Sequence, residues 1–244
     1  MKTVINLLCL CFLFSVISCV PESKKILTEV DVQLKDQTYQ RIFEHQYQEN
    51  TDSLIVYLSD DNPTYRLLAA QAFASHQDKK ALDTLYTLLD DPVIKVRSMA
   101  AYSIGQIKDK NSEQNLIKGF RQRDTMSVDN SANGSILTAM GKLGNPKMAE
   151  YMINASGYRD LDTLLLEGRA KSLYYYGSNN VSSPQLIEFA VSTVKSKRLS
   201  DKTRLYAAQY LARTENLDIE KVKFQIAEAF TLEDNLNVKM AWAT

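Results

Sequence analysis

Residues 90–107 read DDPVIKVRSMAAYSIGQI and predict a turn followed by a helix with one apolar face. Pro92 suits the first helical turn, because the N–H group that it lacks would have no partner there. Asp90 and Asp91 precede it and can cap free N–H groups. The apolar residues recur every three or four positions, which places them on one side of a helix: Val93, Val96, Ala100, Ile104 and Ile107. Small residues between them let a second helix approach closely.

Other stretches repeat this helix along the chain. The sequence RSMAAYSIG at 97–105 aligns with RLLAAQAFA at 66–74 and RLYAAQYLA at 204–212, and more weakly with 136–144 and 169–177. Matched positions lie 31, 36, 33 and 35 residues apart (66 to 97, 100 to 136, 136 to 169 and 172 to 207). Periods of this size are typical of stacked helix pairs. We therefore predict an all-α fold, a right-handed α-solenoid of about five and a half helix pairs.

The repeated pattern also carries a family resemblance. Asp-Pro-x-x-x-Val-Arg-x-x-Ala-Ala-x-x-Ile-Gly, beginning at Asp91, resembles the HEAT repeat, including its short bilin-lyase-type subclass. The resemblance extends from about Thr51 to the C-terminus. It implies that the second helix of each pair lines the concave side of the stack.

The first residues read as a targeting segment. Lys2 provides a positive start, and residues 4–16 are apolar except for two positions. The sequence VISC at 16–19 resembles a bacterial lipobox, which implies lipid attachment at Cys19 after cleavage. An ordinary signal peptide or an uncleaved anchor remains open, although the apolar run is short for a spanning helix. All three cysteines lie in this segment, which leaves no cysteine pair for a disulfide in the mature chain.

We accordingly divide the chain into a lipoprotein signal peptide (1–18), a tether (19–35) and a solenoid (36–244). Val20 follows the lipobox cysteine where the common inner-membrane retention signal has aspartate. We therefore expect a lipid anchor in the bacterial outer membrane that faces the periplasm, with the cell surface as an alternative. The last residues, 235–244, begin like another second helix and end on an apolar edge, so we expect the solenoid to lack its C-terminal cap.

The charges and motifs exclude several function classes. Lysine and arginine number 29, aspartate and glutamate also 29, so the formal net charge is zero, which argues against nucleic-acid binding. The chain has no Ser/His/Asp arrangement, glycine-rich phosphate loop or HExxH motif. His45 and His76 are the only histidines, and we expect both at exposed positions with no metal site. We predict no catalytic residue, no cofactor and no small-molecule substrate.

Basic and acidic residues recur at fixed places in the repeats. Arginines recur at one register, with aspartates just ahead of them, and the set comprises Asp61, Arg66, Asp91, Arg97, Asp201 and Arg204. An anion clamp is one interpretation. We favour a structural ladder that ties successive helix pairs together, because such residues recur from repeat to repeat.

A second set marks a candidate groove for a partner. Two columns spaced four residues apart fall on one face of the second helices. They are polar or amphipathic among apolar neighbours, and the candidates are Gln71, Tyr102, Gln106, Lys142, Lys171, Tyr175, Gln209 and Arg213. Tyr102, Tyr175 and Arg213 are the predicted anchors, since tyrosine and arginine dominate binding hot spots. An ordinary hydrated face is the alternative.

The predicted function is a non-catalytic scaffold that holds a protein or peptide of unknown identity in the bacterial envelope. One alternative is enzymatic. The runs AAYSIGQI, AMGKLG and RLYAAQYLAR resemble the helical N-terminal region of Bacteroidetes lipoproteins that continue into a cyclophilin-type prolyl isomerase. That resemblance would place the activity in a domain outside this sequence. Bilin lyase activity is a third interpretation, which rests only on the resemblance to the short repeats. The predicted export as a lipoprotein argues against it.

Overall fold

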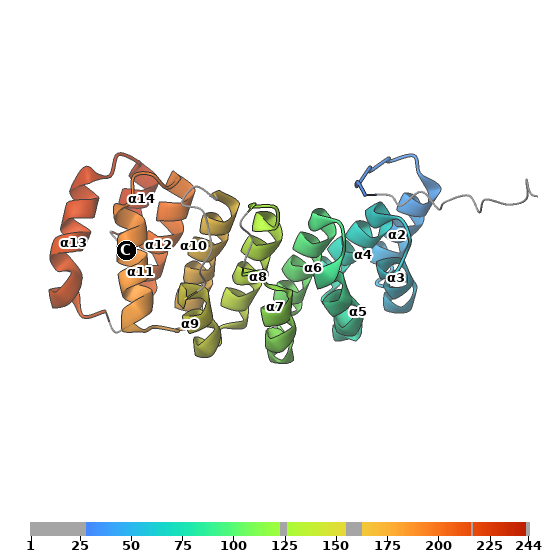
Figure 1. The fold of residues 1–244 in the computed structure, drawn as a ribbon, viewed down its shortest axis with the longest axis horizontal. Coiled ribbons are helices and arrows are strands. Elements are labelled where there is room, and N and C mark those ends of the chain that lie inside the picture. Colours follow the sequence, from blue (N-terminus) through green and yellow to red (C-terminus); the bar gives the residue numbers. More distant parts are fainter. Residues whose placement is uncertain (1–27, 123–125, 155–162, 216, 243–244) are drawn as a thin grey trace, which may run out of the picture.

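The computed structural model describes residues 28–122, 126–154, 163–215 and 217–242. Within these ranges all regular structure is helical, and the helices follow one another in an elongated stack from α2 (Gln37–Tyr47) at one end to α13 and α14 at the other (Figure 1). The predicted α-solenoid is confirmed. The described part of the chain has no helix with the length and hydrophobicity needed to span a bilayer. The predicted signal peptide, with Cys19, lies outside the described residues.

The helices form two rows. The outer row holds the first helix of each pair: α3 (Thr51–Leu58), α5 (Leu82–Thr87), α7 (Glu113–Gly119), α9 (Pro146–Asn154), α11 (Pro184–Lys195) and α13 (Ile219–Leu232). The inner row holds the second: α4 (Pro63–His76), α6 (Ile94–Ile107), α8 (Asn130–Leu143), α10 (Thr163–Ser178), α12 (Asp201–Arg213) and α14 (Leu236–Met240). Short 3-10 turns flank the outer helices at Lys79–Ala81, Leu88–Asp90 and Lys110–Ser112. From α4 to α12, each inner helix packs directly on the next.

The core lies between the two rows. The five apolar residues predicted on one face of this helix are all buried, with exposed fractions of 8% or less; four lie on α6 and Val93 directly precedes it. They continue into Phe73 on α4 and Leu137 on α8, so the core runs along the stack without a break. The solenoid is therefore stabilised mainly by apolar burial between neighbouring repeats.

The start of α6 differs from the prediction. The helix begins at Ile94, two residues after Pro92. The Asp91 carboxylate accepts a hydrogen bond from the Val93 N–H at 2.8 Å, which closes a local turn around Pro92. In the first repeat Pro63 does occupy the first helical position, capped by the Asn62 side chain. Both helices begin three residues before their arginine, Arg66 or Arg97, and the second repeat has two more residues between the proline and the arginine.

Helices α8 and α10 pack at a glycine pair. A Cβ atom on Gly168 would lie 2.4 Å from the Cα and carbonyl oxygen of Gly134. A Cβ atom on Gly134 would lie 2.6 Å from the carbonyl oxygen of Leu164. Gly134, which weakens the helical pattern in the sequence, is thus the point of closest backbone contact. The two helices can approach this far only because neither has a side chain there.

The arginines form rungs that cross from one repeat to the next. Arg66 on α4 donates to both Asp91 carboxylate oxygens, at 2.6 and 3.0 Å. Arg97 on α6 pairs with Asp129, which directly precedes α8. Each arginine also holds the turn before its own helix, Arg66 through the carbonyls of Asp60 and Asp61. The carboxylate of each rung therefore comes from the next repeat.

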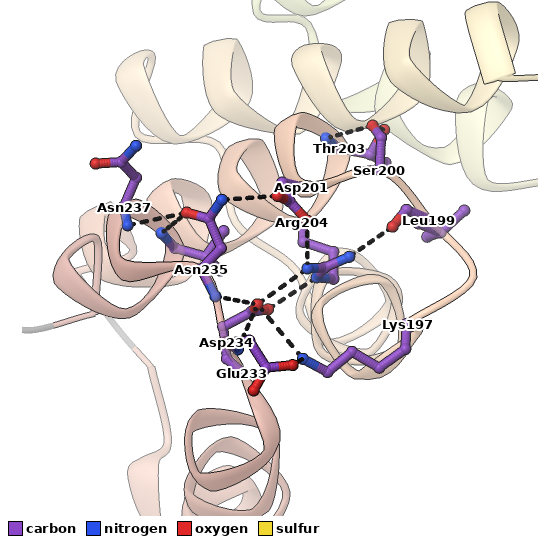
Figure 2. Close-up of polar contacts among 11 residues, drawn as sticks. Lys197, Leu199, Ser200, Asp201, Thr203, Arg204, Glu233, Asp234, Asn235 and Asn237 are labelled. Carbon is purple, nitrogen blue, oxygen red and sulfur yellow. Dashed lines mark hydrogen bonds and ion pairs between the residues drawn. The ribbon is translucent and has the colours of Figure 1, made fainter.

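The last rung is the most extensive (Figure 2). Arg204 on α12 donates to both oxygens of Glu233, at 2.8 and 2.9 Å, and to the carbonyl of Leu199. Asp201, from the same helix, accepts from Arg204 at 2.7 Å and is 60% exposed. Glu233 is 2% exposed, and the hydrogen bonds from Arg204 lower the pKa of its carboxyl to about 2. This network fastens the C-terminal end of α13 and the start of α14 to α12.

Candidate functional site

The inner row carries a cluster of three tyrosines and a glutamine around one lysine, here called the tyrosine–lysine cluster: Tyr102 and Gln106 on α6, Lys142 on α8, and Tyr174 and Tyr175 on α10. Tyr102 and Gln106 lie one helical turn apart, and the Gln106 amide donates to the Tyr102 hydroxyl at 2.6 Å. Stacking of three inner helices brings these five side chains together. Four of them are among the eight residues proposed from the sequence.

Lys142 occupies the centre of the cluster. Its ammonium lies 4.8 Å from the ring centroid of Tyr102 and 5.2 Å from that of Tyr175, and it donates to the Gln106 carbonyl oxygen at 2.7 Å. Cation–π contacts on both sides hold the charge in place. The residue is only 6% exposed. Burial is the main reason that its pKa falls to about 8, and the nearby charges of Lys171 and Lys108 lower it further.

Arg213 is the last residue of α12, the inner helix that follows α10. Its guanidinium carbon lies 4.7 Å from the ring centroid of Tyr174. Tyr174 contacts Tyr175 edge to face at 5.2 Å and Tyr206 at 6.0 Å between centroids. Tyr174 therefore joins the predicted anchors Tyr175 and Arg213 into one surface.

The sequence did not single out Tyr174 and Tyr206. Tyr174, Tyr175 and Tyr176 are consecutive, and a helix turns by about 100° per residue, so each faces a different direction. Tyr176 is fully buried in the core, and burial raises the pKa of its hydroxyl. The run of three consecutive tyrosines at the end of an inner helix was the sequence feature that could have indicated Tyr174.

The other predicted groove residues lie apart from the cluster centre. Gln71 lies with Phe43 and Tyr39 around a cavity of about 360 Å³ beside α2. Gln209 contributes its backbone carbonyl to Arg213 at 3.3 Å. Lys171 lines a hollow of about 210 Å³ between α6, α8 and α10 that Tyr102 also borders. The structure thus concentrates the polar inner face on α6 to α12 and separates Gln71 from it.

His76 is more enclosed than we expected. Its side chain is 13% exposed, and its Nε2 lies 2.7 Å from the Thr51 hydroxyl, which donates to Asp78 at 2.6 Å. His76, the last residue of α4, thus packs its ring against the start of α3. Among the residues that the structure describes, no group of three or more potential ligands is gathered for a metal ion.

Comparisons with known proteins agree with this geometry. A family model described as HEAT repeats matches residues 51–132. The match to HEAT repeats is thus limited to residues 51–132, whereas the α-solenoid fold extends through the described chain. A chain from the complex of CpcE and CpcF of phycocyanin lyase from Nostoc sp. PCC7120 has a similar structure, with 20% sequence identity and a TM-score of 0.56. The similarity covers 91% of this chain and 90% of that one. No curated protein matched the sequence.

The similarity to the phycocyanin lyase chain concerns the fold, because the identity is low. It supports the arrangement of helix pairs along nearly the whole solenoid, including repeats after residue 132 that the HEAT family model does not reach. HEAT repeats are helical scaffolds that present an extended surface to other proteins. The tyrosine–lysine cluster lies on the inner row of this stack, on α6, α8 and α10.

Proposed function

We propose that this protein is a non-catalytic scaffold that holds a protein partner on the inner row of its solenoid. The tyrosine–lysine cluster is the observation that carries the proposal. Tyrosine and arginine contribute more than other residues to binding energy when a partner covers them. Tyr102 is 39% exposed, and the rings of the cluster are held by neighbours on adjacent helices, so little side-chain entropy is lost on binding.

The shape of the inner face also favours a protein partner. The hollow beside Tyr102 and Lys171 measures about 210 Å³ and is lined by small residues such as Ser98, Ser131 and Gly134. Sites for drug-sized ligands usually measure about 300–1,000 Å³ and enclose most of the ligand. A shallow hollow of this size suits single side chains of a partner that lies across several helices.

We also infer that the scaffold is lipid-anchored in the bacterial envelope, most simply at the outer membrane facing the periplasm. The support is the lipobox-like sequence at 16–19 and the confinement of all cysteines to the first nineteen residues. Replacing Cys19 with alanine should move the protein from the membrane fraction to the soluble fraction, or leave its precursor uncleaved. The mass of the native membrane-extracted protein tests the same inference: residues 19–244 plus lipid is the expected value. A mass larger by a domain would favour the isomerase alternative.

Photocrosslinking tests the proposed binding surface. A benzoylphenylalanine placed at Tyr102 should give a discrete protein adduct in native membranes, because this residue is an exposed member of the cluster. The same amino acid at Lys118, exposed on outer helix α7, is the matched control and should give none. Equal adducts from both positions, or none from Tyr102, would contradict a partner site on the inner row.

A further inference from the structure

Four cations at or near the C-terminal half of the inner helices have no acidic partner among the residues that the structure describes: Lys108, Lys142, Lys171 and Arg213. Lys142 contacts one amide and two rings, and Arg213 contacts a backbone carbonyl and the Tyr174 ring. The ammonium groups of Lys108 and Lys171 make no hydrogen bond or ion pair with any residue that the structure describes. Elsewhere in the described chain, lysines and arginines commonly pair with carboxylates, as in the rungs formed by Arg66, Arg97 and Arg204.

The acidic side chain that lines the hollow beside Tyr102 and Lys171 is already paired. Glu167 lines the same hollow as Lys171, but its carboxylate accepts from Lys202 on α12 at 2.6 Å. Lys142, which is nearly enclosed, therefore holds its charge next to two other positive charges and no negative one. Burial of an unneutralised charge is costly, and a carboxylate brought from outside would reduce that cost.

We propose that the inner row binds an extended acidic segment of the partner protein, an inference that rests on the proposed scaffold function. The carboxylates of this segment pair with the four cations, and its apolar side chains pack on the tyrosine rings that lie between the cations. The contacting residues are Tyr102, Lys108, Lys142, Lys171, Tyr174 and Arg213.

The spacing of these four cations along the inner row favours a peptide ligand over other anionic ligands. One cation lies on or at the end of each successive inner helix, α6 to α12, with aromatic rings between them. Inner helices packed about 8–10 Å apart place the first and last cation roughly 24–30 Å apart, which about eight or nine extended residues span. Nucleic acids and anionic membranes favour a denser basic surface, whereas this chain has a formal net charge of zero.

The test uses a fluorescent peptide of about ten residues that alternates glutamate and leucine. A glutamine–leucine peptide of the same length is its neutral counterpart. The full-length protein should bind the acidic peptide saturably, and more weakly at higher salt. The neutral peptide should bind far less. Binding should also raise the pKa of Lys142 from its value of about 8, followed by NMR of methylated lysines.

Three variants locate the site. Lys142→Met and Arg213→Gln should each weaken binding of the acidic peptide by about tenfold. Lys118→Gln removes the same charge from outer helix α7 and should leave binding unchanged. Arg213 is exposed, so its variant keeps the test valid even where the Lys142 variant folds poorly.

Several outcomes would overturn the inference. Equal binding of the two peptides would show that peptide charge does not determine the affinity. An equal loss of affinity in Lys118→Gln and Arg213→Gln would show that the peptide does not bind at the inner row. Stronger binding of an oligothymidylate or of phosphatidylglycerol vesicles than of the acidic peptide would assign the cations to phosphate. A Tyr102 crosslink to a partner without any peptide binding would reject the acidic segment and leave the scaffold proposal standing.

Discussion

Replacing Glu233 with glutamine should lower the free energy of unfolding by about 3 kcal/mol, because the buried guanidinium of Arg204 loses its buried counter-charge and keeps only Asp201, which is 60% exposed. Arg204 and Glu233 are 6% and 2% exposed, and they share two hydrogen bonds. Glu233 also accepts from the N–H groups of Asp234 and Asn235 at 3.0 and 2.9 Å. Chemical denaturation measures the loss. Hydrogen exchange should place it in α12 to α14, because solenoid repeats contact only their neighbours.

Acidification provides an independent check of the same rung. The folded pKa of Glu233, about 2, lies below its ordinary value of 4.5, so its contribution to stability is present above pH 4.5. That contribution is lost as the pH falls from 4.5 toward 2. The stability difference between the wild type and Glu233→Gln should therefore narrow over this range.

The neighbouring residue supplies a matched control. Asp234 is 98% exposed and lies 3.5 Å from Lys197, so Asp234→Asn should change stability by less than about 0.5 kcal/mol. An equal loss of stability in the two variants would mean that the change in net charge, rather than the loss of the buried ion pair, causes the destabilisation. A difference between wild type and Glu233→Gln that is independent of pH would contradict the lowered pKa.

Replacing Gly168 with alanine should lower the free energy of unfolding by about 2 kcal/mol. The added Cβ would lie 2.4 Å from backbone atoms of Gly134, so α8 and α10 would have to separate. Such overpacking costs up to about 3 kcal/mol, which the better helix propensity of alanine offsets by about 1 kcal/mol. Thermal or chemical unfolding measures the difference.

Gly177→Ala is the control in the same helix. Its new Cβ would come no closer than 3.2 Å to a ring atom of Tyr210, which can shift by a few tenths of an ångström. We expect little loss, or a small gain from helix propensity. Equal destabilisation at Gly168 and Gly177 would mean that the α8–α10 contact is less tight than the structure indicates.

The sequence predicted the rows of helices because each repeat carries the same local pattern. It also placed the arginines of the ladder. Two of their acceptors, Asp129 and Glu233, were missed because the prediction sought each carboxylate just ahead of its own arginine. Glu233 had a signal: it stands six residues before Lys239, as Asp91 does before Arg97. Asp129 lacks that signal, since the third inner helix has asparagine, Asn133, at the matching register.

The candidate site was only partly predictable for a geometric reason. Spacing within one helix placed Tyr102 with Gln106, and the structure keeps them in hydrogen bond contact. Which residues of two neighbouring helices contact each other depends on the axial offset between those helices, which the spacing within one helix does not determine. Lys142 therefore meets Tyr102 and Tyr175, whereas Gln71 faces α2.

The most direct test of the account is competition at the photocrosslink from position 102. Native membranes carrying benzoylphenylalanine there are irradiated with an excess of the acidic peptide or of its glutamine counterpart. The acidic peptide should abolish the partner adduct, and the glutamine peptide should leave it unchanged. An adduct that persists at saturating acidic peptide would contradict the central claim that the inner row holds its partner through an acidic segment.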